Sequence, residues 1–130
     1  MKLKSILFAA FAVAFVSSCG PTVEEKIKAF EETHEAMMTE YKQTMDSLSA
    51  NPAEAEAYYN DFVEKYLAFN LEAAKENPDN DVAVQVLMNL RGMIDDEQVA
   101  EIIGNMPEEM LENEKVAYLK KGLDARKATA

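Results

Sequence analysis

One histidine and two methionines at helical spacing are the residues best suited to bind a metal. His34 is the only histidine of the chain, and Met37 and Met38 follow it by three and four positions. Residues at this spacing share one face of a helix, and imidazole with thioether sulfur suits copper or an axial haem position. A useful copper site needs further ligands from a second helix. The sequence therefore favours a half-buried histidine beside gap-filling methionines, and it predicts no metal and no cofactor.

Adjacent acidic residues could be considered as partners in general acid and base catalysis. Neighbouring residues on a helix point about 100° apart, so such a pair does not converge on one substrate atom. Helix N-terminal charges and solvated helix faces explain the pairs without catalysis. The sequence has no glycine-rich phosphate loop and no Ser-His-Asp set, and it predicts a protein that is not an enzyme. The pairs are Glu24-Glu25, Glu31-Glu32, Asp95-Asp96 and Glu108-Glu109.

Cys19 is the only cysteine, and it follows a segment with the features of an export signal. Lys2 and Lys4 give a basic start, and residues 6–16 form an apolar run, ILFAAFAVAFV. This run is too short to span a bilayer, but it suits a cleaved signal. The sequence VSSC that ends at Cys19 resembles the lipobox of bacterial lipoproteins, in which the cysteine sulfur receives a diacylglyceryl group. The resemblance predicts lipidation of Cys19 and a membrane contact through lipid, with no spanning helix.

Two other interpretations of this segment remain open. Val16 and Ser18 also fit the small-residue rule of an ordinary signal peptidase, which would release a soluble protein. Alternatively, Cys19 could be a plain thiol in an uncleaved anchor. We expect the lipidated form, in the bacterial cell envelope. Gly20 stands where an aspartate retains some lipoproteins at the inner membrane, so the outer membrane is favoured over the inner one.

Charge and composition restrict both the partners and the fold. The chain has 13 basic and 24 acidic residues, and its net charge of −11 becomes more negative without Lys2 and Lys4. Such a chain repels phosphates, so we expect no nucleic-acid partner. Four Gly, four Pro and no Trp indicate helices and not a turn-rich β fold. The predicted organisation is a signal peptide over residues 1–18, a lipidated cysteine and short tether over 19–21, and a single all-α domain over 22–130.

Apolar residues at steps of three and four predict two long amphipathic helices. The first begins at a capping box of Thr22 and Glu25, and the second follows Asn51 and Pro52 and ends before Asn77. A tight turn between them would make an antiparallel hairpin. Each helix carries these apolar residues as a stripe along one side. The stripe of the first helix consists of Val23, Ile27, Phe30, His34, Met37, Tyr41, Met45 and Leu48, and that of the second consists of Ala55, Tyr59, Phe62, Tyr66, Phe69 and Ala73.

Shorter helices complete the predicted fold, which is a small all-α bundle of about five helices with the long hairpin at its N-terminal end. No segment alternates with period two for long enough to indicate a sheet. The expected start signals are Asp81 for a helix over about residues 82–91, Asp95 or Asp96 for one that stops at residues 104–105, and Pro107 for a last stretch broken near Asn113.

Three segments of the C-terminal half follow one another in an order that resembles one protein family. They are ENPDN at residues 76–80, DDEQVAEIIGNMPEE at 95–109 and KVAYLKKGLDARKATA at 115–130. They look like the helical segment that precedes the thioredoxin domain in TlpA-like thiol-disulfide oxidoreductases. The resemblance implies an envelope location and a helical fold. Those enzymes act through a Cys-x-x-Cys pair, and no cysteine follows Cys19, so no catalytic residue transfers to this chain.

Together these patterns predict a helical lipoprotein of the cell envelope that acts through contacts with an unknown envelope protein. The aromatic and methionine residues of the two long helices are the expected contact surface, above all the face over residues 58–69. Two alternatives remain open. The chain could carry a small apolar ligand in a cavity between the long helix hairpin and the C-terminal helices, or it could be a remnant of a TlpA-like oxidoreductase without the thioredoxin domain.

Overall fold

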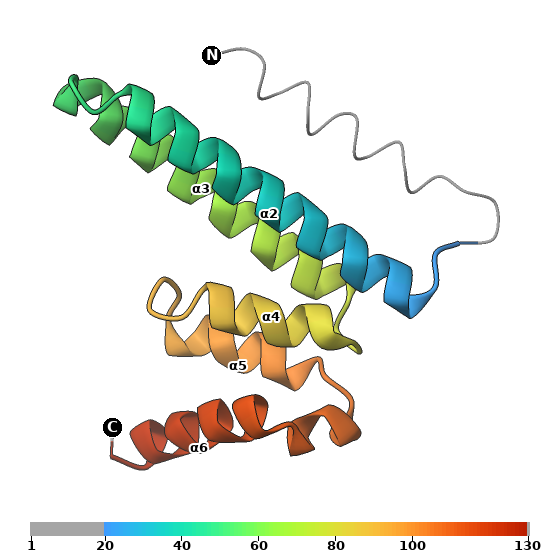
Figure 1. The fold of residues 1–130 in the computed structure, drawn as a ribbon. Helices are drawn as coiled ribbons and strands as arrows, with labels where there is room; N and C mark the ends of the chain where they lie inside the picture. Colours follow the sequence, from blue (N-terminus) through green and yellow to red (C-terminus); the bar gives the residue numbers. More distant parts are fainter. Residues whose placement is uncertain (1–19, 130) are drawn as a thin grey trace. The chain divides into compact units, whose positions relative to one another are not determined.

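The computed structural model describes residues 20–129, and this part of the chain is all-α. It contains five α-helices, one short 3₁₀ helix and no strand. Figure 1 draws these elements as a ribbon coloured along the sequence. The all-α class and the number of helices expected from the sequence are confirmed. Cys19, the expected lipidation site, and the signal segment before it lie outside the described residues. The elements are α2 (Val23–Ser47), α3 (Pro52–Glu76), α4 (Asp81–Asn89), α5 (Asp96–Gly104), η1 (Glu108–Glu112) and α6 (Glu114–Thr129).

The chain divides between Thr44 and Met45 into two compact units. The first unit holds most of α2, and the second holds α3 to α6. The helix α2 begins at the capping box expected from the sequence. The backbone N–H of Thr22 donates to Oε1 of Glu25 at 2.8 Å, and the backbone N–H of Glu25 donates to Oγ1 of Thr22 at 3.1 Å. Each side chain thus satisfies a backbone donor that the first turn leaves without an intrahelical partner.

The helix α3 begins and ends at two asparagine-proline pairs. Asn51 occupies the N-cap position as expected, but its side chain makes no capping hydrogen bond, and Pro52 opens the helix. At the other end the backbone N–H and the side-chain amide of Asn77 both donate to the carbonyl of Ala73, at 2.9 and 3.1 Å. Proline fits the first position of a helix, and it disfavours helical geometry in the residue before it, so the two pairs delimit α3.

The helix α4 is the centre of the second unit, because its side chains are buried on nearly every face. Val82, Ala83 and Val86 are fully buried, and Leu87 is almost so. An apolar surface all round is typical of a helix surrounded by others. The N-cap is Asn80 and not Asp81, which corrects the expectation from the sequence. Oδ1 of Asn80 accepts the backbone N–H of Val82 at 2.8 Å, and Asp81 is already the first helical residue.

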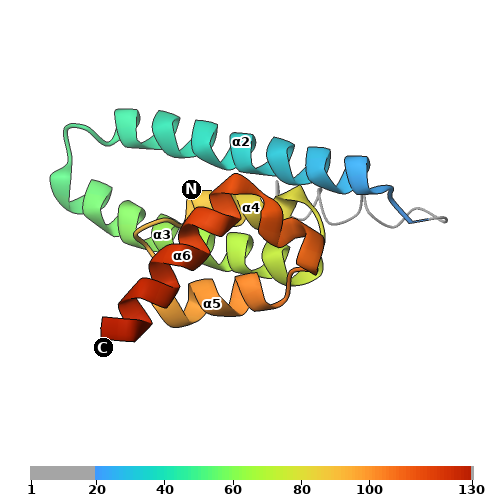
Figure 2. The same cartoon turned by 90° about the horizontal axis from the view of Figure 1, so that it is seen from below.

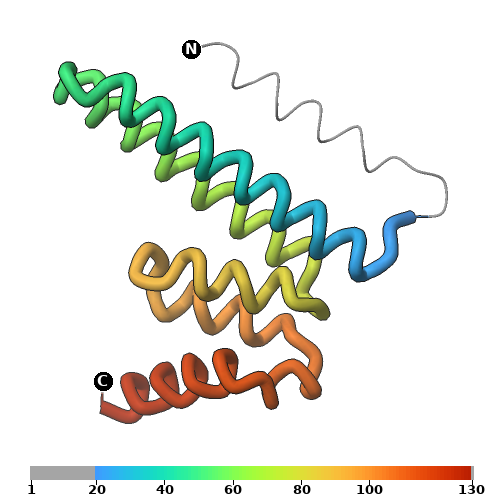
Figure 3. The backbone as a smooth tube through the Cα atoms, in the orientation of Figure 1, coloured from blue at the N-terminus to red at the C-terminus, as the bar shows by residue number. Residues whose placement is uncertain are grey.

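Successive helices of the second unit pack on one another, α3 on α4, α4 on α5 and α5 on α6. The tube in Figure 3 shows that α4 and α5 run in opposite directions, and Figure 2 shows α6 lying obliquely to α5. The helix α5 begins at a capping box in which Oδ1 of Asp95 accepts the backbone N–H of Gln98 at 2.9 Å. Asn113 caps α6 through Oδ1, which accepts the backbone N–H of Lys115 at 2.8 Å. Both features agree with the sequence, which named Asp95 or Asp96 as the cap and Asn113 as a break.

Candidate functional site

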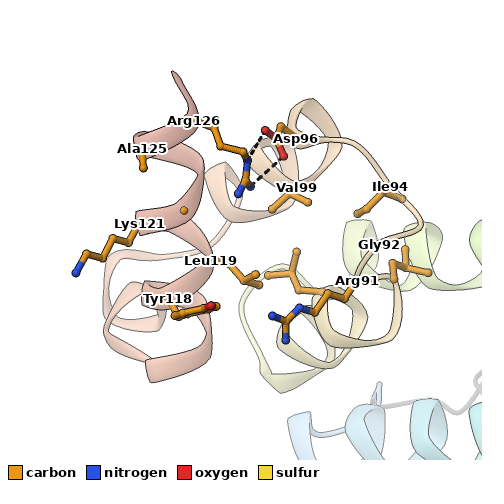
Figure 4. A pocket seen from close by; sticks show the side chains of 13 residues that line it. Arg91, Gly92, Ile94, Asp96, Val99, Tyr118, Leu119, Lys121, Ala125 and Arg126 are labelled. Carbon is orange, nitrogen blue, oxygen red and sulfur yellow. Dashed lines mark hydrogen bonds and ion pairs between the residues drawn. The ribbon is translucent and has the colours of Figure 1, made fainter. Parts of the chain in front are cut away.

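A groove in the second unit is bounded by α4, α5 and α6. It has a volume of about 690 Å³, and we call it the α4–α6 groove. Figure 4 shows the side chains that line it. Its floor is apolar. Leu87 and Leu90 on α4 are buried beneath this floor, and Val99 of α5 and Leu119 of α6, which remain half-buried, form its accessible part. The groove therefore exposes side chains that are already ordered by the core of this unit.

Gly92 makes the turn from α4 into the wall of the groove possible. Its φ angle is 83°, and nothing lies within 4 Å of the place where a Cβ would stand. This left-handed conformation carries a steric penalty for residues with a side chain but not for glycine. The turn brings Arg91 and Ile94 to the groove on either side of Gly92. The sequence predicted only that a helix ends at about residue 91, just before this glycine.

An ion pair between two helices closes one end of the groove. Nε of Arg126 on α6 lies 2.7 Å from Oδ2 of Asp96 on α5, and Nη2 lies 3.0 Å from Oδ1. The planar guanidinium thus meets both carboxylate oxygens, which is the strongest geometry for such a pair. The hydrogen bonds from Arg126 lower the pKa of the Asp96 carboxyl, and those to Asp96 raise the pKa of Arg126. Both side chains are exposed, so the pair fixes geometry more than it adds stability.

A second arginine lies toward the other end of the groove. The guanidinium carbon of Arg91 is 5.9 Å from the ring centroid of Tyr118, over the ring face. This is within the range of a cation–π contact. Tyr118 is 66 % exposed, the largest value among the exposed large hydrophobic residues. An aromatic ring and a cation are therefore presented together at the rim, in the view of Figure 4.

The charges around the groove are unlike those of the chain as a whole. The two arginines of the sequence, Arg91 and Arg126, both line it, together with Lys121 and a single acidic residue, Asp96. Lys121 contributes its stem to the lining, while its ammonium extends outward in Figure 4. Since acidic residues outnumber basic ones 24 to 13 in the chain, this is a locally basic site on an acidic protein.

The candidate metal residues lie on α2, in the first unit. His34 is half-buried, with its ring centroid 6.1 Å from that of Phe30, and burial lowers its pKa. Met37 is buried and Met38 is half-buried. Within residues 20–129, no group of three or more His, Cys, Asp or Glu side chains is placed to hold a metal ion. In the same part of the chain, no helix is both long enough and apolar enough to cross a bilayer.

The adjacent carboxylates Asp95 and Asp96 point to different partners. Asp95 accepts a backbone hydrogen bond in the capping box of α5, whereas Asp96 pairs with Arg126 on α6. The sequence left open which of the two caps the helix, and the structure assigns that role to Asp95. The divergence agrees with the expectation that neighbouring helical residues do not converge on one atom.

The aromatic face of α3, expected to be a contact surface, is mostly covered. Tyr66 is only 8 % exposed, and Tyr58, Phe62 and Phe69 are half-buried, while Tyr59 is 48 % exposed. The rings of Phe62 and Tyr66 stack with centroids 5.5 Å apart. Large exposed apolar area on this face is thus limited to Tyr59.

Sequence reasoning missed three residues that organise the second unit. Arg91 and Tyr118 were not singled out, because their contact joins positions 27 apart in sequence that only the fold brings together. Asn70 was also missed. It is fully buried, its Nδ2 donates to the carbonyl of Tyr66 at 2.9 Å, and its Oδ1 accepts from Nδ2 of Asn89 at 3.1 Å. One sequence signal could have identified Asn70 as a buried residue, because it is a polar residue four positions after Tyr66 on the apolar side of the helix.

Comparison with protein-family models, with curated proteins and with solved structures finds no match to this chain. The likeness to the segment before the thioredoxin domain of TlpA-like proteins accordingly stays a prediction from the sequence.

Proposed function

We propose that this chain is a lipid-anchored, non-catalytic binding module of the bacterial cell envelope, and that it acts through protein contacts. The anchor is the diacylglyceryl group expected on Cys19. The contact surface is the α4–α6 groove, and not mainly the long N-terminal helices favoured from the sequence. The outer membrane is the proposed location, and no nucleic acid is among the proposed partners.

One observation carries the proposal of a contact surface. The α4–α6 groove combines a half-buried apolar floor with an exposed tyrosine and arginine at its rim. Tyrosine and arginine are the residue types enriched where protein interfaces gain most of their energy. By contrast, the aromatic face of α3 exposes chiefly Tyr59. The groove is therefore the better candidate for a partner.

The anchor is tested by feeding growing cells an alkyne analogue of palmitate and detecting label on the chain. We expect label on the wild type and none on Cys19→Ala, with the wild type in the membrane fraction. An unlabelled wild type, or release into the medium, would contradict lipidation. Chemical cross-linking in intact envelopes tests contact, since a reproducible partner is expected. A chain that stays monomeric and uncross-linked at every concentration would contradict it.

The second candidate function is a carrier of a small apolar ligand. It is favoured by the volume of the groove, about 690 Å³, which lies within the roughly 300–1,000 Å³ typical of small-molecule sites. Native mass spectrometry of the chain purified from membranes separates the two candidates. A co-purified small molecule that Leu119→Gln removes would favour the carrier, and a bare chain favours the contact module.

A further inference from the structure

We propose that the α4–α6 groove binds an amphipathic helical peptide segment whose apolar side chains are flanked by carboxylates. This inference rests on the proposed function and specifies the chemistry of its partner. It has three supports in the structure, namely the shape of the groove, the uncompensated positive charge of Arg91 and Lys121, and the position of Arg91 over the Tyr118 ring.

The shape of the groove suits a short stretch of helix. Its lining along α6 runs from Tyr118 to Arg126, which is about 12 Å at 1.5 Å per residue and thus about two turns. Along this line Gly122 and Ala125 keep the wall low between larger side chains. The floor offers Val99 and Leu119, which are half-buried and can be covered further. Apolar anchors at positions i, i+3 or i+4 and i+7 of a bound helix reach such a floor.

The charge of the groove selects a partner with carboxylates. Arg126 and Asp96 neutralise each other, whereas no carboxylate among residues 20–129 forms an ion pair with Arg91 or Lys121. The groove thus keeps positive charge in a chain that is otherwise strongly acidic. Acidic side chains of the chain itself do not compensate it, so a carboxylate on the partner is the complementary group.

The contact with Tyr118 holds Arg91 ready for such a carboxylate. The guanidinium lies over the ring face, 5.9 Å from the centroid, and a guanidinium in this arrangement keeps its N–H groups directed outward in its own plane. A side chain that is already positioned loses less conformational freedom on binding. A paired carboxylate can then accept two hydrogen bonds from Arg91.

The test uses the full chain in phosphatidylcholine nanodiscs, with empty nanodiscs subtracted. Two synthetic helical peptides share leucines at i, i+3 or i+4 and i+7, and they carry either Glu or Lys beside them. We expect the Glu peptide to bind, the Lys peptide to bind about tenfold more weakly or not at all, and the affinity for the Glu peptide to fall as salt is raised. Binding is followed by fluorescence anisotropy of labelled peptide.

Variants with the same change of charge locate the site. Arg91→Glu should lower the affinity for the Glu peptide by about tenfold or more, and it should raise the affinity for the Lys peptide. Lys127→Glu lies on α6 outside the lining of the groove, and it should change neither affinity more than about twofold. Arg91→Lys keeps the positive charge but loses the planar guanidinium. Its affinity for the Glu peptide should therefore lie between those of the wild type and Arg91→Glu. Thermal unfolding checks that each variant remains folded.

The proposal is overturned if both peptides bind equally, if neither binds, or if Lys127→Glu acts as strongly as Arg91→Glu. It is also overturned if dodecanoate binds in an Arg91-dependent way while the Glu peptide does not, because the occupant is then a lipid. None of these outcomes alters palmitate labelling or cross-linking in envelopes. A failure of this inference is thereby distinguishable from a failure of the proposed function.

Discussion

Arg126 on α6 holds Asp96 on α5 through two hydrogen bonds, although the two residues are 30 positions apart in the sequence. The pair joins the first turn of α5 to the last turns of α6 at one end of the α4–α6 groove. It neutralises the charge of one of the two arginines in the groove and leaves Arg91 and Lys121 as the cations available to a partner.

The first prediction concerns the titration of Asp96. Arg126 lowers the pKa of this carboxyl, so its contribution to stability is present above the ordinary carboxylate pKa of about 4 and is lost as pH falls through the lowered value. In Arg126→Gln we expect the pKa of Asp96 to rise toward its ordinary value, as measured by NMR titration. Lys127→Gln removes the same charge from the same helix and should leave that pKa low. An unchanged pKa in Arg126→Gln would contradict the pairing.

A second prediction distinguishes the two residues that could cap α4. Oδ1 of Asn80 accepts the backbone N–H of Val82, and its amide donates to Oδ1 of Asn77 at 3.1 Å. We expect Asn80→Ala to lower the free energy of unfolding by about 1–2 kcal/mol. Asp81→Ala loses only an exposed bond from Gln85 and should cost about 0.5 kcal/mol or less. Urea unfolding measures both, and an equal or larger cost for Asp81→Ala would show that the cap is misassigned.

The third prediction concerns the buried amide pair between α3 and α4. Asn70 is fully buried, and Asn89 donates to it at 3.1 Å. Asn70→Ala should lower the free energy of unfolding by about 1–3 kcal/mol, since it removes a buried hydrogen-bonding group. A double-mutant cycle with Asn89→Ala should give a coupling of about 0.5–1.5 kcal/mol. Asn60→Ala, an exposed change on the same helix, is the control and should be nearly neutral. If the free-energy costs of Asn70→Ala and Asn89→Ala simply add in the double variant, the hydrogen bond between the two side chains is ruled out.

The fourth prediction concerns His34 and pH. Burial lowers the pKa of His34 below 6.5, so the unfolded chain binds a proton more readily than the folded one. Stability from the neutral ring is present above about pH 6.5 and is lost as pH falls below that value. The free energy of unfolding of the wild type should therefore decline between neutral and mildly acid pH more than that of His34→Gln. Identical pH profiles for the two proteins would contradict a half-buried, neutral histidine.

The local features of the helices were largely predictable from the sequence. The capping box at Thr22 and Glu25 and the break at Asn77 depend on residues within one turn of each other. Such interactions are set by spacing along the chain, and spacing is visible in a sequence. The exceptions are the N-caps of α4 and α5, because two favourable N-cap residues are adjacent at each, Asn80 and Asp81 before α4 and Asp95 and Asp96 before α5. Propensity alone could not decide between them.

The groove was not predictable, because its residues come together only when α4, α5 and α6 pack. Arg126 and Asp96 are 30 positions apart, and no local spacing in the sequence indicated that they would pair. The half-buried state of His34 was expected from its place in an apolar stripe, and the structure agrees. Lipidation of Cys19 depends on a signal outside the described residues and stays a prediction.

Site-specific photo-crosslinking in growing cells tests the central claim most directly. A benzoylphenylalanine in place of Tyr118, at the rim of the groove, is compared with the same residue in place of Asn60, exposed on α3. A membrane-anchored contact module predicts a discrete adduct from position 118 that is absent at position 60 and is lost with Arg91→Glu. The account is contradicted if the two positions give the same adducts, or if position 118 gives none.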